Sequence, residues 1–99
     1  MPQGPFQTVS LGAANKSVLN ITDDTIVKAS AGFVVTLVVL DAGSANGGLY
    51  DTAVIADAAA ENEIFAIPQV AGVYTINFPA SSGIVIKPGT GQTIAISYN

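Results

Sequence analysis

The sequence predicts a small all-β protein, an antiparallel β-sandwich or jelly roll of about eight strands with one short helical crossing. Many short runs are dominated by Val, Ile, Thr, Phe and Tyr, the residues that suit a half-buried pleated surface. Gly, Pro, Asn, Asp and Ser separate these runs at short intervals, as turns between strands require. Two of the runs also alternate with the period of a strand.

Nine segments have the composition of strands and set the expected order of elements. They are Phe6–Leu11, Ser17–Ile21, Thr25–Ala29, Phe33–Leu40, Gly48–Ile55, Glu63–Ile67, Val73–Phe78, Ile84–Lys87 and Gln92–Tyr98. Before them, residues 1–5 contain two prolines and a glycine, which predicts an N-terminal arm with little capacity for a ladder. Residues 6–99 contain no internal repeat and no linker, so we expect one β-sandwich domain.

The alternating segments indicate strands with one face on the core. In Val73–Phe78 the residues that point one way are Tyr74, Ile76 and Phe78. In Gln92–Tyr98 they are Ile94, Ile96 and Tyr98.

The segment Phe33–Leu40 differs because both of its faces are apolar. One face would carry Phe33, Val35, Leu37 and Val39, and the other Val34, Thr36, Val38 and Leu40. Such a strand has to be covered on both sides, and a single sandwich supplies only one cover. We therefore expect the second face to lie in a contact between subunits. Tyr50, which follows a Gly-rich loop, is a further interface candidate.

Turn chemistry predicts how the strands are joined. Asn46-Gly47-Gly48 supplies positions that tolerate a positive φ. Residues 80–83 and 88–91 are interpreted as tight hairpin connections. Residues 53–62 are rich in Ala and favour a helical turn or an irregular crossing between sheets, because about ten residues are too few for a stable isolated helix.

The low charge content suggests that part of the surface meets a partner. Only 10% of residues are charged, and Lys87 is the only ionised side chain from Ile64 to Asn99. An average soluble domain has about 25%. We expect copies of the same chain to cover part of this surface. The alternative is a surface made polar by Ser, Thr, Asn and Gln.

Charge and hydropathy argue against two other classes of partner. The net charge is −4, there is no Arg, and the three lysines are isolated, so nucleic acid is not expected. No stretch of 18 apolar residues suggests a membrane span, and the start of the chain lacks the pattern of a signal peptide.

The sequence also predicts no catalytic site. It has no His and no Cys, which excludes Ser-His-Asp, Cys-His and zinc-cysteine chemistry. No metal or cofactor is expected, although two explanations stay open for Asp41, Ser44 and Asn46. They could surround a calcium ion, or they could be turn formers. Gly89-Thr90-Gly91 lacks the pattern of a phosphate loop.

Several motifs resemble a family of small virion structural proteins encoded by tailed phages and prophages. These motifs are Gly48-Leu49-Tyr50-Asp51-Thr52-Ala53, Ala58-Ala59-Ala60-Glu61-Asn62, Ile67-Pro68, Gly72-Val73-Tyr74, Gly83-Ile84-Val85-Ile86, Pro88-Gly89-Thr90-Gly91-Gln92-Thr93 and Ser97-Tyr98. The resemblance is strongest from Phe33 to Tyr98, does not include the Pro-rich start, and supplies no catalytic residues.

The resemblance implies a non-enzymatic component of the virion. It suggests a capsid decoration (cement) protein, or a head-fibre or vertex protein, on the surface of a phage head. Such a protein would form a trimer or dimer and dock on the major capsid protein. A tail or baseplate component is one alternative. A small carbohydrate-binding module that uses Tyr50 and the loop 41–48 is another.

Overall fold

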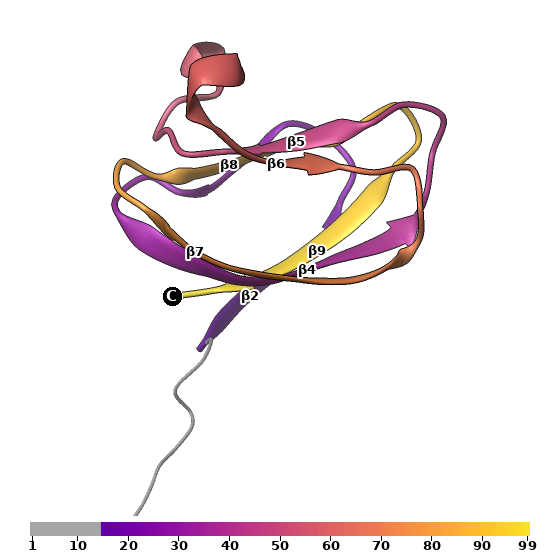
Figure 1. Ribbon diagram of the computed structural model, residues 1–99, viewed down its shortest axis with the longest axis horizontal. Coiled ribbons are helices and arrows are strands. Elements are labelled where there is room, and N and C mark those ends of the chain that lie inside the picture. The colour runs from indigo at the N-terminus through magenta and orange to yellow at the C-terminus, as the bar shows by residue number, and fades with distance from the viewer. Residues whose placement is uncertain (1–14) are drawn as a thin grey trace, which may run out of the picture.

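The protein is an all-β sandwich of two four-stranded antiparallel sheets, so the expected fold class is confirmed (Figure 1). The computed structural model describes residues 15–99. The arm expected at residues 1–5 and the strand expected at Phe6–Leu11 lie outside the described residues.

Eight strands build the two layers. In chain order they are β2 (Lys16–Ile21), β3 (Thr25–Lys28), β4 (Gly32–Asp41), β5 (Gly47–Tyr50), β6 (Glu63–Ile67), β7 (Gly72–Ala80), β8 (Ile84–Lys87) and β9 (Thr93–Tyr98). One sheet has the order β2-β9-β4-β7, and the other has the order β3-β8-β5-β6. Seven of the strand segments expected after residue 14 match these strands closely. The expected segment Gly48–Ile55 is longer than the strand in the structure, because β5 ends at Tyr50.

The strand pairing is nested, which decides between the two expected architectures. β2 pairs with β9, β3 with β8, β4 with β7 and β5 with β6, all antiparallel. A chain paired in this way is one long hairpin. The additional pairs β4–β9 and β5–β8 roll that hairpin into two sheets, which is the topology of a jelly roll.

The rolled topology corrects three expected connections. Residues 80–83 and 88–91 do not close hairpins, because β7, β8 and β9 alternate between the two sheets. A turn is present at 88–91, where the amide of Gln92 donates to the carbonyl of Gly89 at 3.0 Å, but it carries the chain across the sandwich. The positive φ values of described glycines fall at Gly43 and Gly91, and not in Asn46-Gly47-Gly48.

The Ala-rich segment is the third correction. It forms two short 3-10 turns, Ile55–Asp57 and Ala60–Asn62, so a helical turn is present. However, the segment joins β5 to β6, which are neighbours in one sheet, and it does not cross between sheets. Figure 1 shows it rising above the β3-β8-β5-β6 layer.

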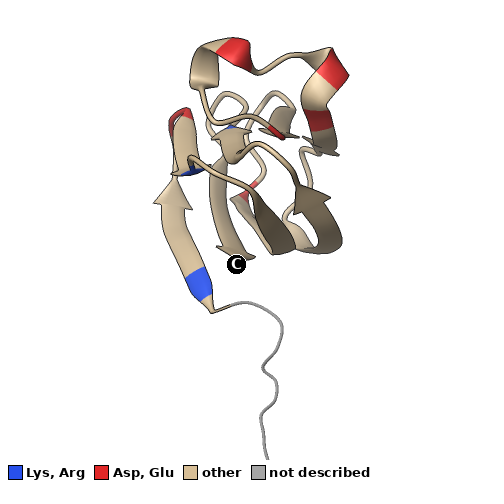
Figure 2. Cartoon of the chain, turned by 90° about the vertical axis from the view of Figure 1, so that its left-hand side faces the viewer, with Lys and Arg blue, Asp and Glu red and all other residues tan. Residues whose placement is uncertain are grey.

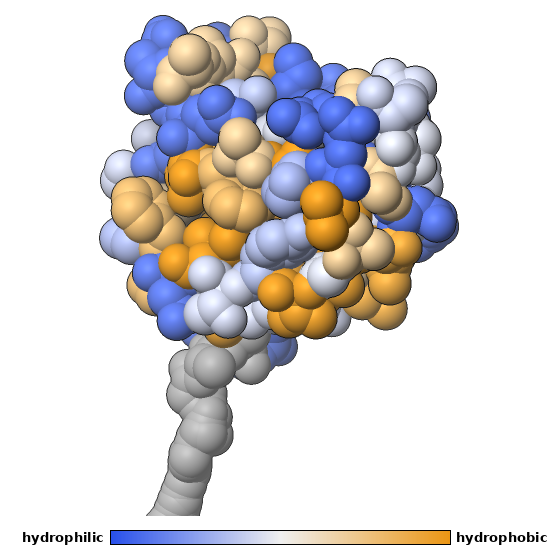
Figure 3. Space-filling view, turned by 45° about the vertical axis from the view of Figure 1, so that its right-hand side comes forward, coloured by the Kyte–Doolittle hydropathy of each residue, from blue (hydrophilic) through white to orange (hydrophobic). Residues whose placement is uncertain are grey.

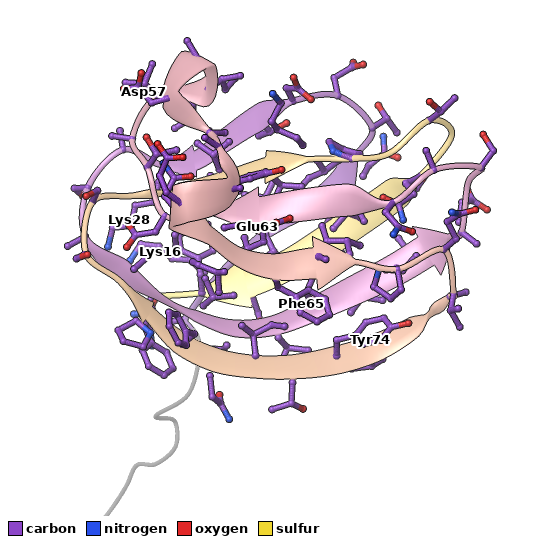
Figure 4. The ribbon with its side chains drawn as sticks, turned by 45° about the horizontal axis from the view of Figure 1, so that its top comes forward. Lys16, Lys28, Asp57, Glu63, Phe65 and Tyr74 are labelled. Carbon is purple, nitrogen blue, oxygen red and sulfur yellow. The ribbon has the colours of Figure 1, made fainter. Side chains whose placement is uncertain are left out.

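The core lies between the two layers and is aliphatic. Its fully buried side chains include Leu37, Leu49, Ile67, Ile84, Ile86, Ile94 and Ile96. At one open side of the sandwich the rings of Phe65 on β6 and Tyr74 on β7 lie 5.7 Å apart, tilted by 48° (Figure 4). This aromatic pair connects the edge strand β6 of one sheet to the edge strand β7 of the other.

The strand most fully buried on both faces is β8, and not the expected Phe33–Leu40; in β9, Ala95 is 9% exposed between the buried Ile94 and Ile96. Ile84, Val85 and Ile86 are all 0% exposed, although adjacent residues of a strand point to opposite faces. In β4 the outward residues Thr36 and Val38 are only half-buried, and Leu40 is 56% exposed. Within this chain, β4 is therefore covered on one face.

Candidate interaction surface

The outward side of the β2-β9-β4-β7 sheet presents two ordered rows of side chains. Val73, Val38 and Ala95 lie in one row across β7, β4 and β9. The second row carries hydroxyl groups and crosses all four strands: Thr75, Thr36, Ser97 and Ser17. We call these seven residues the outer sheet face. Their strand neighbours Leu37, Ile76 and Ile96 point into the core, which sets this direction.

No residue of the outer sheet face is charged. The nearest charges on the described part of this sheet are Lys16, at the start of β2, and Asp41, at the end of β4. Asp41 is held at that border, because Thr93 Oγ1 donates to its Oδ2 at 3.2 Å. Four of the seven acidic residues of the chain instead lie from Asp51 to Glu63, on the loop between β5 and β6 or directly beside it (Figure 2).

Three of the five interface candidates lie on β4 and are at least partly exposed. Thr36 and Val38 belong to the outer sheet face, and Leu40 is 56% exposed next to a register shift between Val39 and Asp41. Whether they meet a partner stays a prediction.

Val34 was wrongly assigned to the interface, because it is 0% exposed and belongs to the core. A β-bulge between Val34 and Thr36 explains the error, because two steps along β4 there lie opposite one step along β9. The extra residue shifts the alternation by one position, so Val34 points inward with Leu37.

Tyr50 lies on the opposite sheet and is not brought together with the other candidates. It is half-buried, and its ring lies over Gly48, where an added Cβ would overlap it. Burial, followed by the nearby charges of Glu63 and Asp24, raises the pKa of the Tyr50 hydroxyl. Tyr50 is therefore only partly exposed, and its role in an interface stays a prediction.

Each of the three candidate calcium ligands has a hydrogen-bond partner in another segment of the chain. Asp41 accepts from Thr93, the amide of Ser44 donates to the carbonyl of Thr90 at 2.8 Å, and Asn46 Oδ1 accepts from Gln69 Nε2 at 3.3 Å. Across residues 15–99 there is no pocket, and no three Asp, Glu, His or Cys side chains form a group that could hold a metal ion. These polar groups instead connect neighbouring loops.

A carboxylate to which the sequence pattern did not point, that of Asp51, organises one end of the sandwich. Asp51 Oδ1 accepts from the amides of Ser82 and Gly83, and Oδ2 accepts from the amide and the hydroxyl of Ser81. Partial burial raises the pKa of Asp51, but the hydrogen bonds from Ser82, Ser81 and Gly83 outweigh it and lower the pKa overall. An Asp after a strand is an ordinary turn former, so nothing in the sequence pointed to a partner 30 residues away.

The fold and the surface define the class of this protein: a jelly-roll β-sandwich with one uncharged sheet face. Comparison of the chain with protein-family models, with curated proteins and with solved structures finds no match. The described residues include no helix of the length and hydrophobicity needed to cross a bilayer.

Proposed function

We propose that this protein is a non-enzymatic structural component of a phage particle, a capsid decoration or head-fibre protein on the surface of the head. It self-associates as a trimer or dimer and docks on the major capsid protein. The jelly roll supports this proposal because the architecture recurs in viral capsid domains. A fold alone does not define a function, so the outer sheet face carries the argument.

The outer sheet face has the chemistry of a surface that is covered in an assembly. Burying a charged group without a partner is costly, and this face has none to bury. Its hydroxyl row can exchange hydrogen bonds with water for hydrogen bonds with a partner. Its apolar row gains from burial, because covering a valine such as Val73, now 70% exposed, contributes on the order of 1.5 kcal/mol.

The distribution of charge gives this protein one uncharged side and one acidic side. The loop between β5 and β6 carries Asp57 and Glu61, and Glu63 begins β6 directly after it; all three are exposed (Figures 2 and 4). These carboxylates keep the layer opposite the outer sheet face in contact with water. In this arrangement the outer sheet face meets other copies or the shell, and the acidic loop faces solvent.

Self-association through the outer sheet face is tested with Val38→Asp. Leu40→Asp is a second variant at a more exposed position, where a charge should leave the fold intact. Val54→Asp is the matched control, since Val54 is 48% exposed on the acidic loop. Light scattering should show a larger oligomer for the native chain and Val54→Asp than for the other two, which lose the contact through the outer sheet face. A native chain that is monomeric at tens of micromolar would refute self-association.

The location on the particle is tested by cryo-electron microscopy of purified virions, with and without the protein. Density on the head surface supports the proposal. Density confined to the tail refutes the decoration role and favours a tail or baseplate component. Binding to a glycan array that disappears in Tyr50→Ala would favour a carbohydrate-binding module instead.

A further inference from the structure

The jelly roll has four edge strands, and they are unequally protected against pairing with another chain. β2, β3 and β6 contain six, four and five residues, and each carries a charged residue: Lys16, Lys28 and Glu63. β7 has nine residues and no charge. Short length and charged side chains are the usual means of blocking an edge, and β7 has neither.

Two features of β7 define which part of its edge is open. Asn77 has a φ of +47° next to a register shift, and Pro79 has no amide hydrogen, so neither continues a regular ladder. The open ladder is therefore Gly72–Ile76. Three of the seven exposed large hydrophobic residues of the described chain lie on β7 or in the turn before it, namely Val70, Val73 and Phe78. Figure 3 shows apolar side chains at the surface of the molecule in a view that brings this side forward.

We propose that the open edge of β7 receives the segment Phe6–Leu11 of a second copy as an additional strand. This segment has the sequence Phe-Gln-Thr-Val-Ser-Leu, which is uncharged like β7 and rich in residues that favour strands. Its six residues are enough to span the five residues of the open ladder. Backbone hydrogen bonds would supply the affinity, as in other cases of strand addition.

The reach of the chain excludes the same copy as the donor. Leu11 and Asn15 are four residues apart, a span of at most about 14 Å. Residues 16–21 form β2, at the opposite edge of the sheet from β7. A strand added outside β7 lies four strand spacings from β2, or about 19 Å. The start of β2 is also level with Phe78, through Tyr98 and Val34, so the open ladder extends further away.

The competing acceptor is the edge of β2 in the same chain, which the segment can reach by a hairpin. That edge is less suitable for two reasons. Lys16 places a charge on it, and a bulge that contains Asn20, at a φ of +56°, leaves only Lys16–Val18 in regular register. An edge of this kind offers three consecutive residues, against four for β7 at Gly72–Thr75.

Donation from each copy to the next produces a head-to-tail contact, which closes into a ring if the rotation permits. This contact uses a strand edge and not the outer sheet face. It therefore stands independently of the proposed location on a virion.

The first experiment uses the full chain and a proline in the donor segment. Val9→Pro removes an amide from the middle of that segment, and Gln3→Pro is the control outside it. Hydrogen exchange at the amides of Gly72–Ile76 that point away from β4 should be slow in the native chain and the control, and this protection should be lost in Val9→Pro. Equal exchange in all three proteins would overturn the proposal. Val38→Asp, which tests the outer sheet face, should leave the protection at β7 in place.

The second experiment identifies the acceptor with engineered disulfides, because the chain has no Cys of its own. Val9→Cys and Thr8→Cys sample both faces of the donor, and Val73→Cys and Thr75→Cys sample the acceptor. Mixing donor and acceptor chains under oxidation should give a link between two chains, since bridged Cα atoms lie about 4.4–6.8 Å apart. A link within one chain in the double variant Val9→Cys, Leu19→Cys, or no link from either donor position, would overturn the proposal.

Discussion

The carboxylate of Asp51 binds the backbone of Ser82 across 31 residues of sequence, with Oδ1 accepting from the amide nitrogen at 2.8 Å. Together with Ser81 and Gly83, this contact attaches the end of β5 to the crossing between β7 and β8. Asp51 thus replaces backbone pairing at a point where the chain leaves one sheet for the other.

Replacing Asp51 should destabilise the fold. Asp51→Ala removes a charged acceptor of four hydrogen bonds, and we expect the free energy of unfolding to fall by about 2 kcal/mol. Urea denaturation measures this difference. Asp57→Ala, in the same loop, is the control and should change stability little; equal losses in the two variants would contradict the assigned role.

The stabilisation by Asp51 should depend on pH. Its pKa is lowered in the folded state, so the stabilisation is complete above the ordinary pKa of Asp, about 3.9, and is lost as the pH falls through the folded value. The difference in urea midpoint between the native chain and Asp51→Ala should be constant near neutrality and shrink below about pH 4. A difference that persists unchanged in acid would show that the contact does not require the charge.

Burial on both faces predicts that β8 tolerates truncation less well than β4. Val85 is 0% exposed, whereas Val38 is only half-buried within one chain. Val85→Ala should therefore cost about 2 kcal/mol through lost burial and a cavity, and Val38→Ala clearly less. Both values come from chemical denaturation at concentrations where the chain is monomeric, and the reverse order would contradict the assigned burial.

The buried amide of Gln92 should be hard to replace. It is 1% exposed, its Oε1 accepts from the amide of Gly89 at 2.8 Å, and its Nε2 donates to the carbonyl of Pro68 at 3.0 Å. Gln92→Leu keeps a similar volume but removes both hydrogen bonds and leaves the amide of Gly89 and the carbonyl of Pro68 without this partner. The free energy of unfolding should fall by about 1–3 kcal/mol. Gln69→Leu, at an exposed position, should be close to neutral in the same thermal and urea measurements.

Tyr50 should titrate above an ordinary tyrosine. Burial is the main cause, followed by the negative charges of Glu63 and Asp24. Glu63→Gln should lower the pKa of Tyr50 only in part, as followed by the ultraviolet absorbance of tyrosinate. Because the folded pKa is raised, ionisation of Tyr50 should destabilise the protein as the pH rises above the ordinary value of about 10. A complete return to the ordinary pKa in Glu63→Gln would contradict burial as the main cause.

Alternation was a sound guide wherever the strand was regular. Tyr74, Ile76, Ile94, Ile96 and Tyr98 pack on or in the core, as expected from the period of two. Phe78 is 49% exposed, because Asn77 adopts a positive φ and interrupts β7 before it. The bulge after Val34 caused the corresponding error in β4. Bulges are set by the partner strands, so periodicity within one strand does not reveal them.

The sequence by itself determined that this chain forms short antiparallel strands, and it placed most of their boundaries, because strand propensity and turn residues are local properties. Only the tertiary structure decided that the nested strands roll into a jelly roll, that β8 is the doubly covered strand, and that Asp51 joins the crossing at Ser82. The physical reason is distance along the chain. Pairing, burial and hydrogen bonding between segments 30 or more residues apart depend on how the sheets pack, and a single sequence does not encode them as a local pattern.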